Sequence, residues 1–194
     1  MRRIAILVLV TCALFLSTLD LGLCQERKIF RIEPVVGAIQ PVGDLADFYQ
    51  MGLVYGIKGE MEIAEYPCLA LGIGLFFQEP GSKSENGETE FSIRQISGSL
   101  SYIIAPGSDF TPYLTFGAGN YREKVESPLT EAEPWIKVTT TNQRFGLNLG
   151  LGGNLFPDWA ENVGVDLVGK YHVVYESHST TKFFDFVGGL FYQF

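Results

Sequence analysis

The composition of this chain of 194 residues excludes several classes of protein. Its 14 Lys and Arg stand against 22 Asp and Glu, which gives a formal net charge of −8. Nucleic acid is therefore a disfavoured partner, because phosphate polymers attract basic surfaces. With 2 His and 3 Cys, the chain lacks the residues for a zinc module or a disulfide framework. The length fits one domain of ordinary size.

The N-terminus has the pattern of a secretory signal peptide. Arg2 and Arg3 precede an apolar run over residues 4–19, which ends at Asp20. We expect residues 1–24 to be the signal peptide and residues 25–194 to form the mature domain. Cleavage before Cys24, rather than after it, would instead give a lipoprotein, and the sequence leaves both open. No later apolar run is long enough for a transmembrane helix, so the mature chain is either secreted or spans a membrane as a closed β-barrel.

Period-2 alternation of apolar and polar residues dominates the mature chain and predicts eight β-strands. In chain order they cover about residues 30–40, 51–62, 68–78, 95–104, 112–121, 144–155, 163–174 and 184–194. The pattern is less regular in the first and fifth of these. Each strand has about ten residues or more, the length that a tilted strand needs to span a bilayer. We predict an all-β fold, an eight-stranded antiparallel up-and-down transmembrane β-barrel preceded by the signal peptide.

The predicted connections differ in length. The long or medium ones are 41–50, 79–90, 124–137 and 176–182, and the short ones are 64–66, 106–110 and 157–162. Outer-membrane barrels have short periplasmic turns and longer extracellular loops. The alternation therefore predicts that both termini are periplasmic and that acidic loops lie outside the cell.

The two faces of the predicted strands differ in chemistry. One is bulky and apolar, and we assign it to lipid; Arg94, near a loop, is the main exception. The other combines small residues with charges of both signs, and we assign it to the lumen, where an apolar soluble core would not accept them. The predicted lumen charge network comprises Arg31, Glu33, Lys58, Glu60, Glu62, Arg144, Asp166, Lys170, His172 and Asp185.

Aromatic residues cluster where the strands are expected to meet the two membrane interfaces. Those expected at the periplasmic side are Phe30, Tyr66, Tyr102, Phe110, Phe156, Trp159, Tyr192 and Phe194. Those expected at the outer side are Phe48, Phe91, Tyr121, Trp135, Tyr175 and Phe183. We interpret both sets as aromatic girdles.

The C-terminal segment 186–194 ends in Phe, with apolar or aromatic residues at alternating positions before it. It resembles the C-terminal signature of bacterial outer-membrane proteins. Residues 112–119 and 36–44 are similar to segments of the outer-membrane β-barrel domain family of OmpA/OmpX-like small barrels. The resemblance implies the bacterial outer membrane as location, membrane lipid as partner, and recognition by the barrel-assembly machinery during biogenesis. The signature residues are Phe186, Leu190, Tyr192 and Phe194.

Several functions are compatible with such a barrel. The sequence favours a non-enzymatic structural or surface-interaction role with no cofactor, no metal site and an unspecified extracellular ligand. A small pore or a conduit for apolar solutes is the main alternative. A lipid A-modifying enzyme would need a Ser–His–acid set, for which Ser177, His178 and Glu176 are the candidates, although neighbouring residues of a strand point to opposite faces. A secreted lipocalin-like carrier is a further alternative.

Overall fold

A computed structural model describes residues 30–83, 89–104, 110–128, 137–157, 162–176 and 180–194. Almost all of them lie in strands. The strands are β1 (Phe30–Val42), β2 (Tyr49–Ile63), β3 (Tyr66–Ser82), β4 (Glu90–Ile103), β5 (Phe110–Pro128), β6 (Lys137–Leu155), β7 (Val163–Tyr175) and β8 (Thr180–Gln193), and a four-residue helix, α2 (Leu45–Phe48), precedes β2. No helix in these described segments is long and apolar enough to cross a membrane.

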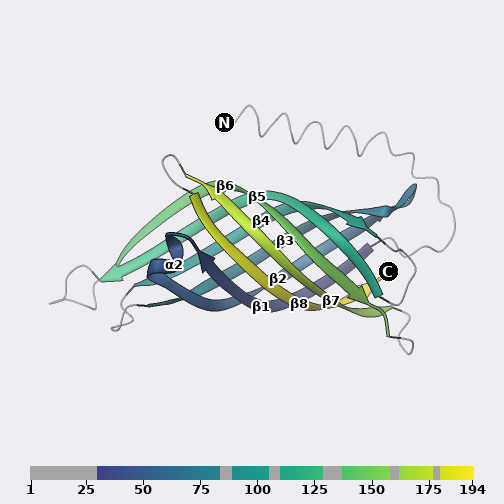
Figure 1. Ribbon diagram of the computed structural model, residues 1–194, viewed down its shortest axis with the longest axis horizontal. Helices are drawn as coiled ribbons and strands as arrows, with labels where there is room; N and C mark the ends of the chain where they lie inside the picture. Colours follow the sequence, from purple (N-terminus) through teal and green to yellow (C-terminus); the bar gives the residue numbers. More distant parts are fainter. Residues whose placement is uncertain (1–29, 84–88, 105–109, 129–136, 158–161, 177–179) are drawn as a thin grey trace.

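The eight strands form one closed antiparallel barrel in sequence order (Figure 1). The ring closes because the first strand pairs with the last, from Arg31 opposite Gln193 to Val42 opposite Lys182. The backbone N–H of Phe194 also donates to the carbonyl of Phe30 at 2.8 Å. The predicted eight-stranded up-and-down barrel is confirmed.

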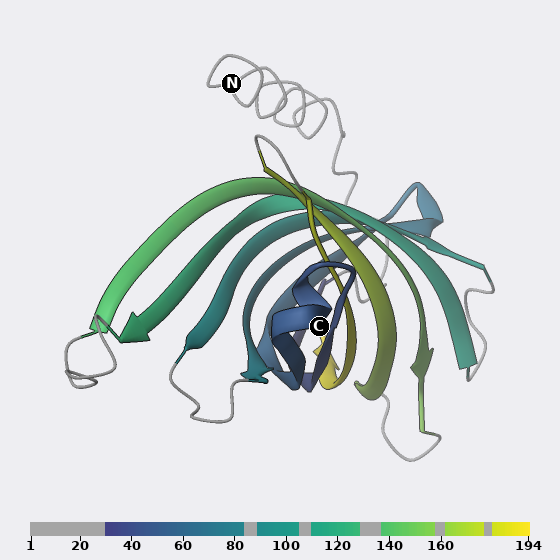
Figure 2. The ribbon, with the colours of Figure 1, turned by 60° about the vertical axis from the view of Figure 1, so that its left-hand side comes forward.

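The two ends of the barrel differ. We call the end that holds Phe30 and Phe194 the terminus end, and the end that holds α2 the loop end (Figure 1). At the loop end β5 and β6 extend beyond their neighbours as ribbons of 19 residues each (Figure 2). The segments between strands at the loop end are 43–48, 83–89, 129–136 and 176–179, and those at the terminus end are 64–65, 104–109 and 156–162. The predicted difference in connection length is therefore weak, because parts of the predicted long connections, residues 124–128 among them, lie in paired strands.

The outer face of the barrel is apolar and the lumen face holds the buried charges. Leu149 and Leu151 on the outer face of β6 are 61% and 62% exposed, whereas the neighbouring Asn148, on the lumen face, is buried. The same alternation runs along the other strands, since successive side chains of a strand point to opposite faces. This arrangement is the reverse of a soluble carrier, so the lipocalin-like alternative is wrong.

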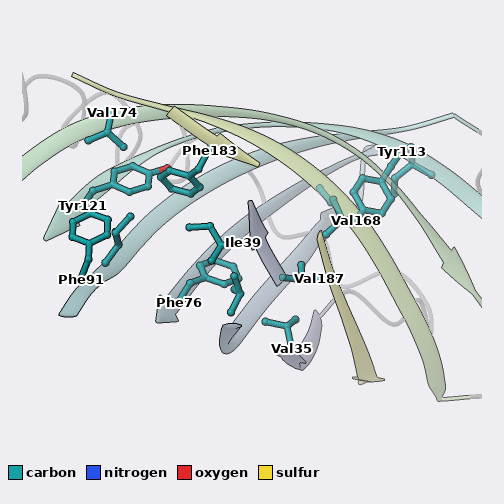
Figure 3. Packing of buried hydrophobic residues seen from close by; sticks show 14 residues of the cluster. Val35, Ile39, Phe76, Phe91, Tyr113, Tyr121, Val168, Val174, Phe183 and Val187 are labelled. Carbon is teal, nitrogen blue, oxygen red and sulfur yellow. The ribbon is translucent and has the colours of Figure 1, made fainter. Parts of the chain in front are cut away.

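Seven apolar or aromatic side chains pack in the loop half of the lumen (Figure 3), beside the buried Gln78, Gln95 and Glu123. This apolar layer consists of Ile39, Val54, Phe91, Ile93, Tyr121, Val174 and Phe183. Leu45 of α2 and Tyr49 pack against it, so the first loop covers the layer from the loop end. The girdle predicted for Phe91, Tyr121 and Phe183 is wrong, because their positions in the alternation turn them into the lumen; Trp135 and Trp159 lie outside the described residues.

Candidate functional site

The densest group of buried charges lies in the terminus half of the lumen. This ionic cluster comprises Arg31, Glu33, Lys58, Glu60 and Asp166, all at least nine-tenths buried. The Lys58 Nζ atom lies 2.6 Å from Asp166 Oδ2, 2.9 Å from Glu33 Oε2 and 3.6 Å from Glu60 Oε2. Arg31 Nη2 lies 2.7 Å from Glu60 Oε1. Each carboxylate therefore has a cation beside it, which buried charges require.

The ionic cluster joins strands that are not neighbours in the sheet. Lys58 is on β2 and Asp166 on β7, with β1 and β8 between them in the ring. The Tyr113 hydroxyl of β5 donates to Asp166 Oδ1 at 2.7 Å, from a third wall. These contacts cross the lumen, because an eight-stranded barrel is narrow enough for side chains to fill it.

Lys170 provides a second bridge across the barrel. It is on β7, and its Nζ atom lies 4.7 Å from the centre of the Phe76 ring on β3, four strands away on either path around the ring. An ammonium group over an aromatic face is attracted by the ring quadrupole. Asp185 is the cross-strand partner of Lys170 on β8. Lys170 therefore contacts the Phe76 ring across the lumen, and it lies opposite Asp185 on the neighbouring strand.

A hydrogen-bonded chain of Asp185, His172, Tyr121 and Asn148 reaches into the apolar layer, to which Tyr121 belongs. His172 Nε2 lies 2.8 Å from Asp185 Oδ2, and His172 Nδ1 lies 2.9 Å from the Tyr121 hydroxyl. Asn148 Nδ2 donates to the same hydroxyl at 3.3 Å. The bonds are all satisfied when Tyr121 donates to Nδ1 and the Nε2–H group donates to Asp185.

A carboxylate–imidazole–hydroxyl array is also the arrangement that activates a nucleophile in hydrolases. Here Tyr121 and His172 are both 0% exposed, so no substrate reaches the hydroxyl in this conformation. The His172 ring is stacked on Phe183 with 4.5 Å between centroids. The array therefore links the polar and apolar halves of the lumen and does not form an open active site.

The structure places the other predicted network residues apart from this centre. Arg144 lies near the loop end, where its Nε atom is 3.2 Å from Glu123 Oε2 and its guanidinium also pairs with Glu176. Glu62 lies partly buried near the terminus end of β2. The predicted set therefore divides into the ionic cluster, the Lys170–His172–Asp185 group and these two outlying residues.

Sequence reasoning missed several uncharged partners in the lumen. Tyr113, Phe76 and Tyr121 contact predicted network residues, and Asn148 contacts Tyr121. Their position in the period-2 alternation was the available signal, since each has the parity of the lumen face.

Within the described ranges, no group of three or more His, Cys, Asp or Glu side chains is arranged to hold a metal ion. The candidate residues Ser177 and His178 lie outside the described part of the chain. The four residues of the C-terminal signature do lie within it, on the outer face of β8, and all are exposed: Phe186, Leu190, Tyr192 and Phe194.

Comparison with known proteins agrees with this architecture. The profile of the outer membrane protein beta-barrel domain family matches residues 7–194. Comparison with curated protein sequences finds no match. Among solved structures, Neisserial surface protein A superimposes with a TM-score of 0.63 at 16% identity, covering 85% of this chain and 97% of that one.

Two further solved structures are similar. The N-terminal β-barrel domain of Pseudomonas aeruginosa OprF has a TM-score of 0.50 at 12% identity, covering 87% of this chain and all of that one. Ail, the attachment invasion locus protein of Yersinia pestis, has a TM-score of 0.50 at 12% identity, with coverages of 86% and 100%. At these identities the likeness concerns the fold.

Proposed function

Because the chain belongs to the outer membrane protein β-barrel domain family, we propose that it is a non-enzymatic barrel with a structural and surface-interaction role. Its location is the bacterial outer membrane and its apolar outer face contacts lipid. In the proposed role the lumen is closed to solutes, and the loop end is the part available to extracellular partners.

The contact between Lys58 and Asp166 is the observation that carries this proposal. It joins β2 to β7 through the lumen at 2.6 Å, and the apolar layer packs in the loop half above it. A pore would require an aqueous path past both. Neither of the two grooves whose linings are described reaches the ionic cluster, since both are lined by residues near the loop end.

Conductance across a planar bilayer tests the closed lumen. We expect the refolded protein to insert without giving steady channels. The triple variant Lys58→Ser, Asp166→Ser, Tyr113→Ser removes the bridging groups, and any folded fraction should conduct more than the wild type. Heat-modifiable migration on a gel reports folding in both samples. Steady, sizeable wild-type channels would support the pore instead.

We further propose that both termini are periplasmic and the loop end extracellular, because the longest paired extension, at the tips of β5 and β6, is at that end. A Thr139→Cys variant in a Cys68→Ser background should react with a membrane-impermeant maleimide on intact cells. A Gln193→Cys variant should react only after the outer membrane is opened. The reverse labelling pattern would contradict the orientation.

The exposed C-terminal signature is proposed as the segment that the assembly machinery recognises. Phe194 directly follows β8 and is 61% exposed, so its replacement removes little packing within the barrel. A Phe194→Ala variant should lower the assembled, heat-modifiable fraction in cells several-fold and refold normally in detergent. Leu167→Ala, an exposed apolar position on β7, is the matched control. Equal assembly of the two variants would contradict this role.

A further inference from the structure

The outer face of the barrel carries a basic patch at the loop end, formed by Arg94 of β4 with Arg122 and Lys124 of β5. These three side chains line a groove of about 290 Å³ together with Thr139 and Thr141 of β6. Both arginines are exposed. The patch is separate from the lumen network, because its residues have the opposite parity on their strands.

The position of the patch relative to the apolar face is set by the strand register. Ile96 of β4 and Phe145 of β6 flank Asn120 of β5 in one cross-strand row. Arg94 and Arg122 form the next row toward the loop end. Rows on one face are two residues, or about 7 Å, apart. On β4 and β5 the cations therefore begin one row beyond Ile96 and Phe145, and Phe77 of β3 lies beside Arg94 in the same row.

The two arginines of the patch repel each other. Arg94 and Arg122 are direct cross-strand partners, and like charges at such positions destabilise a sheet. Among the described residues, neither forms an ion pair with a carboxylate, whereas Lys124 pairs with Glu126. The Arg94 guanidinium lies 5.7 Å from the centre of the Phe77 ring, which supports it from one side. An anion between the two guanidinium groups would relieve their repulsion.

We propose that the basic patch binds the phosphate of an outer-leaflet lipid, whose acyl chains lie along the apolar face below. Guanidinium groups bind phosphate through paired, charge-assisted hydrogen bonds, and the threonine hydroxyls at the groove add further donors. The groove lies one row from the outward-facing Ile96 and Phe145, and this apolar neighbourhood favours a lipid over a free ion. The net charge of −8 disfavours a long soluble polyanion. The outer-leaflet assignment rests on the proposed function, because it requires the loop end to be extracellular.

Binding of diphosphorylated lipid A to the refolded full barrel in neutral detergent, followed by native mass spectrometry, tests the proposal. We expect the double variant Arg94→Gln, Arg122→Gln to bind at least tenfold more weakly than the wild type. The same lipid without its phosphates should bind the wild type as weakly. The control is Lys182→Gln, which removes an exposed cation near the loop end of β8 and should bind like the wild type.

Three results would overturn the proposal: equal binding by the double variant, equal binding of the dephosphorylated lipid, or displacement of the lipid by inorganic phosphate at the same concentration as the lipid itself. The last would indicate a site for a free anion. A folded Arg94→Lys, Arg122→Lys variant should retain part of the binding, which separates loss of charge from loss of structure. Binding in micelles is independent of orientation, so the cysteine-labelling experiment fails or succeeds separately from this one.

Discussion

The two halves of the lumen differ in the chemistry of their main contacts. The terminus half is held by the ionic cluster around Lys58, and the loop half by the apolar layer around Tyr121 and Phe183. Buried ions are costly unless each is paired, and their contacts have defined partners and directions. Apolar side chains need only the right volume and shape. The ionic cluster therefore specifies which strands contact each other across the lumen. The apolar layer closes the lumen beneath the first loop.

The largest expected effect is in the ionic half. Lys58→Met removes the cation that lies within 4 Å of three carboxylates, and breaking a buried pair on one side costs about 3–5 kcal/mol. The free energy of unfolding in lipid vesicles, from urea titration, measures the loss. Adding Asp166→Asn to this variant should recover part of it. A loss below about 1 kcal/mol would show that the cluster is hydrated and contributes little.

The apolar half should respond to lost volume instead of lost charge. Phe183 is fully buried and stacked on His172, and Phe183→Ala should cost about 3 kcal/mol through the cavity it leaves. The same titration measures it. Phe183→Leu, which keeps most of the volume, is the matched control and should cost clearly less. If both variants lost the same free energy of unfolding, the Phe183 ring would stabilise the barrel through its stacking on His172 and not through its volume.

A cation on the other face of the sheet tests whether charge is accepted only in the lumen. Leu149 is 61% exposed in the middle of the outer face of β6, and Leu149→Arg should cost about 2–4 kcal/mol, the range for cations at a bilayer midplane. Vesicle unfolding measures the change, with Leu149→Ala as the control for lost side-chain area. A change near zero would mean that this face does not contact hydrocarbon.

The smallest effect is expected at the tip of the loop end, where charges are open to water. Lys137 Nζ lies 2.6 Å from Glu90 Oε1, and the hydrogen bond to Glu90 raises the pKa of Lys137. A raised lysine pKa stabilises the folded state below the ordinary lysine pKa and loses this effect as the pH rises through the folded value. Lys137→Gln should still leave the unfolding free energy at neutral pH unchanged within error, because exposed pairs contribute little. A clear loss would mean that the extension of β5 and β6 is held by its ion pairs.

The sequence predicts the faces of this barrel better than its contacts. Alternation assigns Lys58, Asp166 and His172 to one face, because the side-chain period of a strand is two. Alternation does not predict the contact between Lys58 and Asp166. That contact depends on the stagger of the strands, which sets which residues lie at the same height in the barrel. The predicted fifth strand ends at residue 121, so the alternation does not predict that Arg122 lies opposite Arg94.

Closure of the ring by β1 and β8 has a consequence for biogenesis. The strands that complete the ladder are the earliest and the latest to be synthesised, so every intermediate before the final pairing presents two edges with unsatisfied backbone groups. Such edges are templates for other chains, and pairing between distant segments is slow. Until the last strand pairs, these two edges remain open to pairing with the edges of other chains.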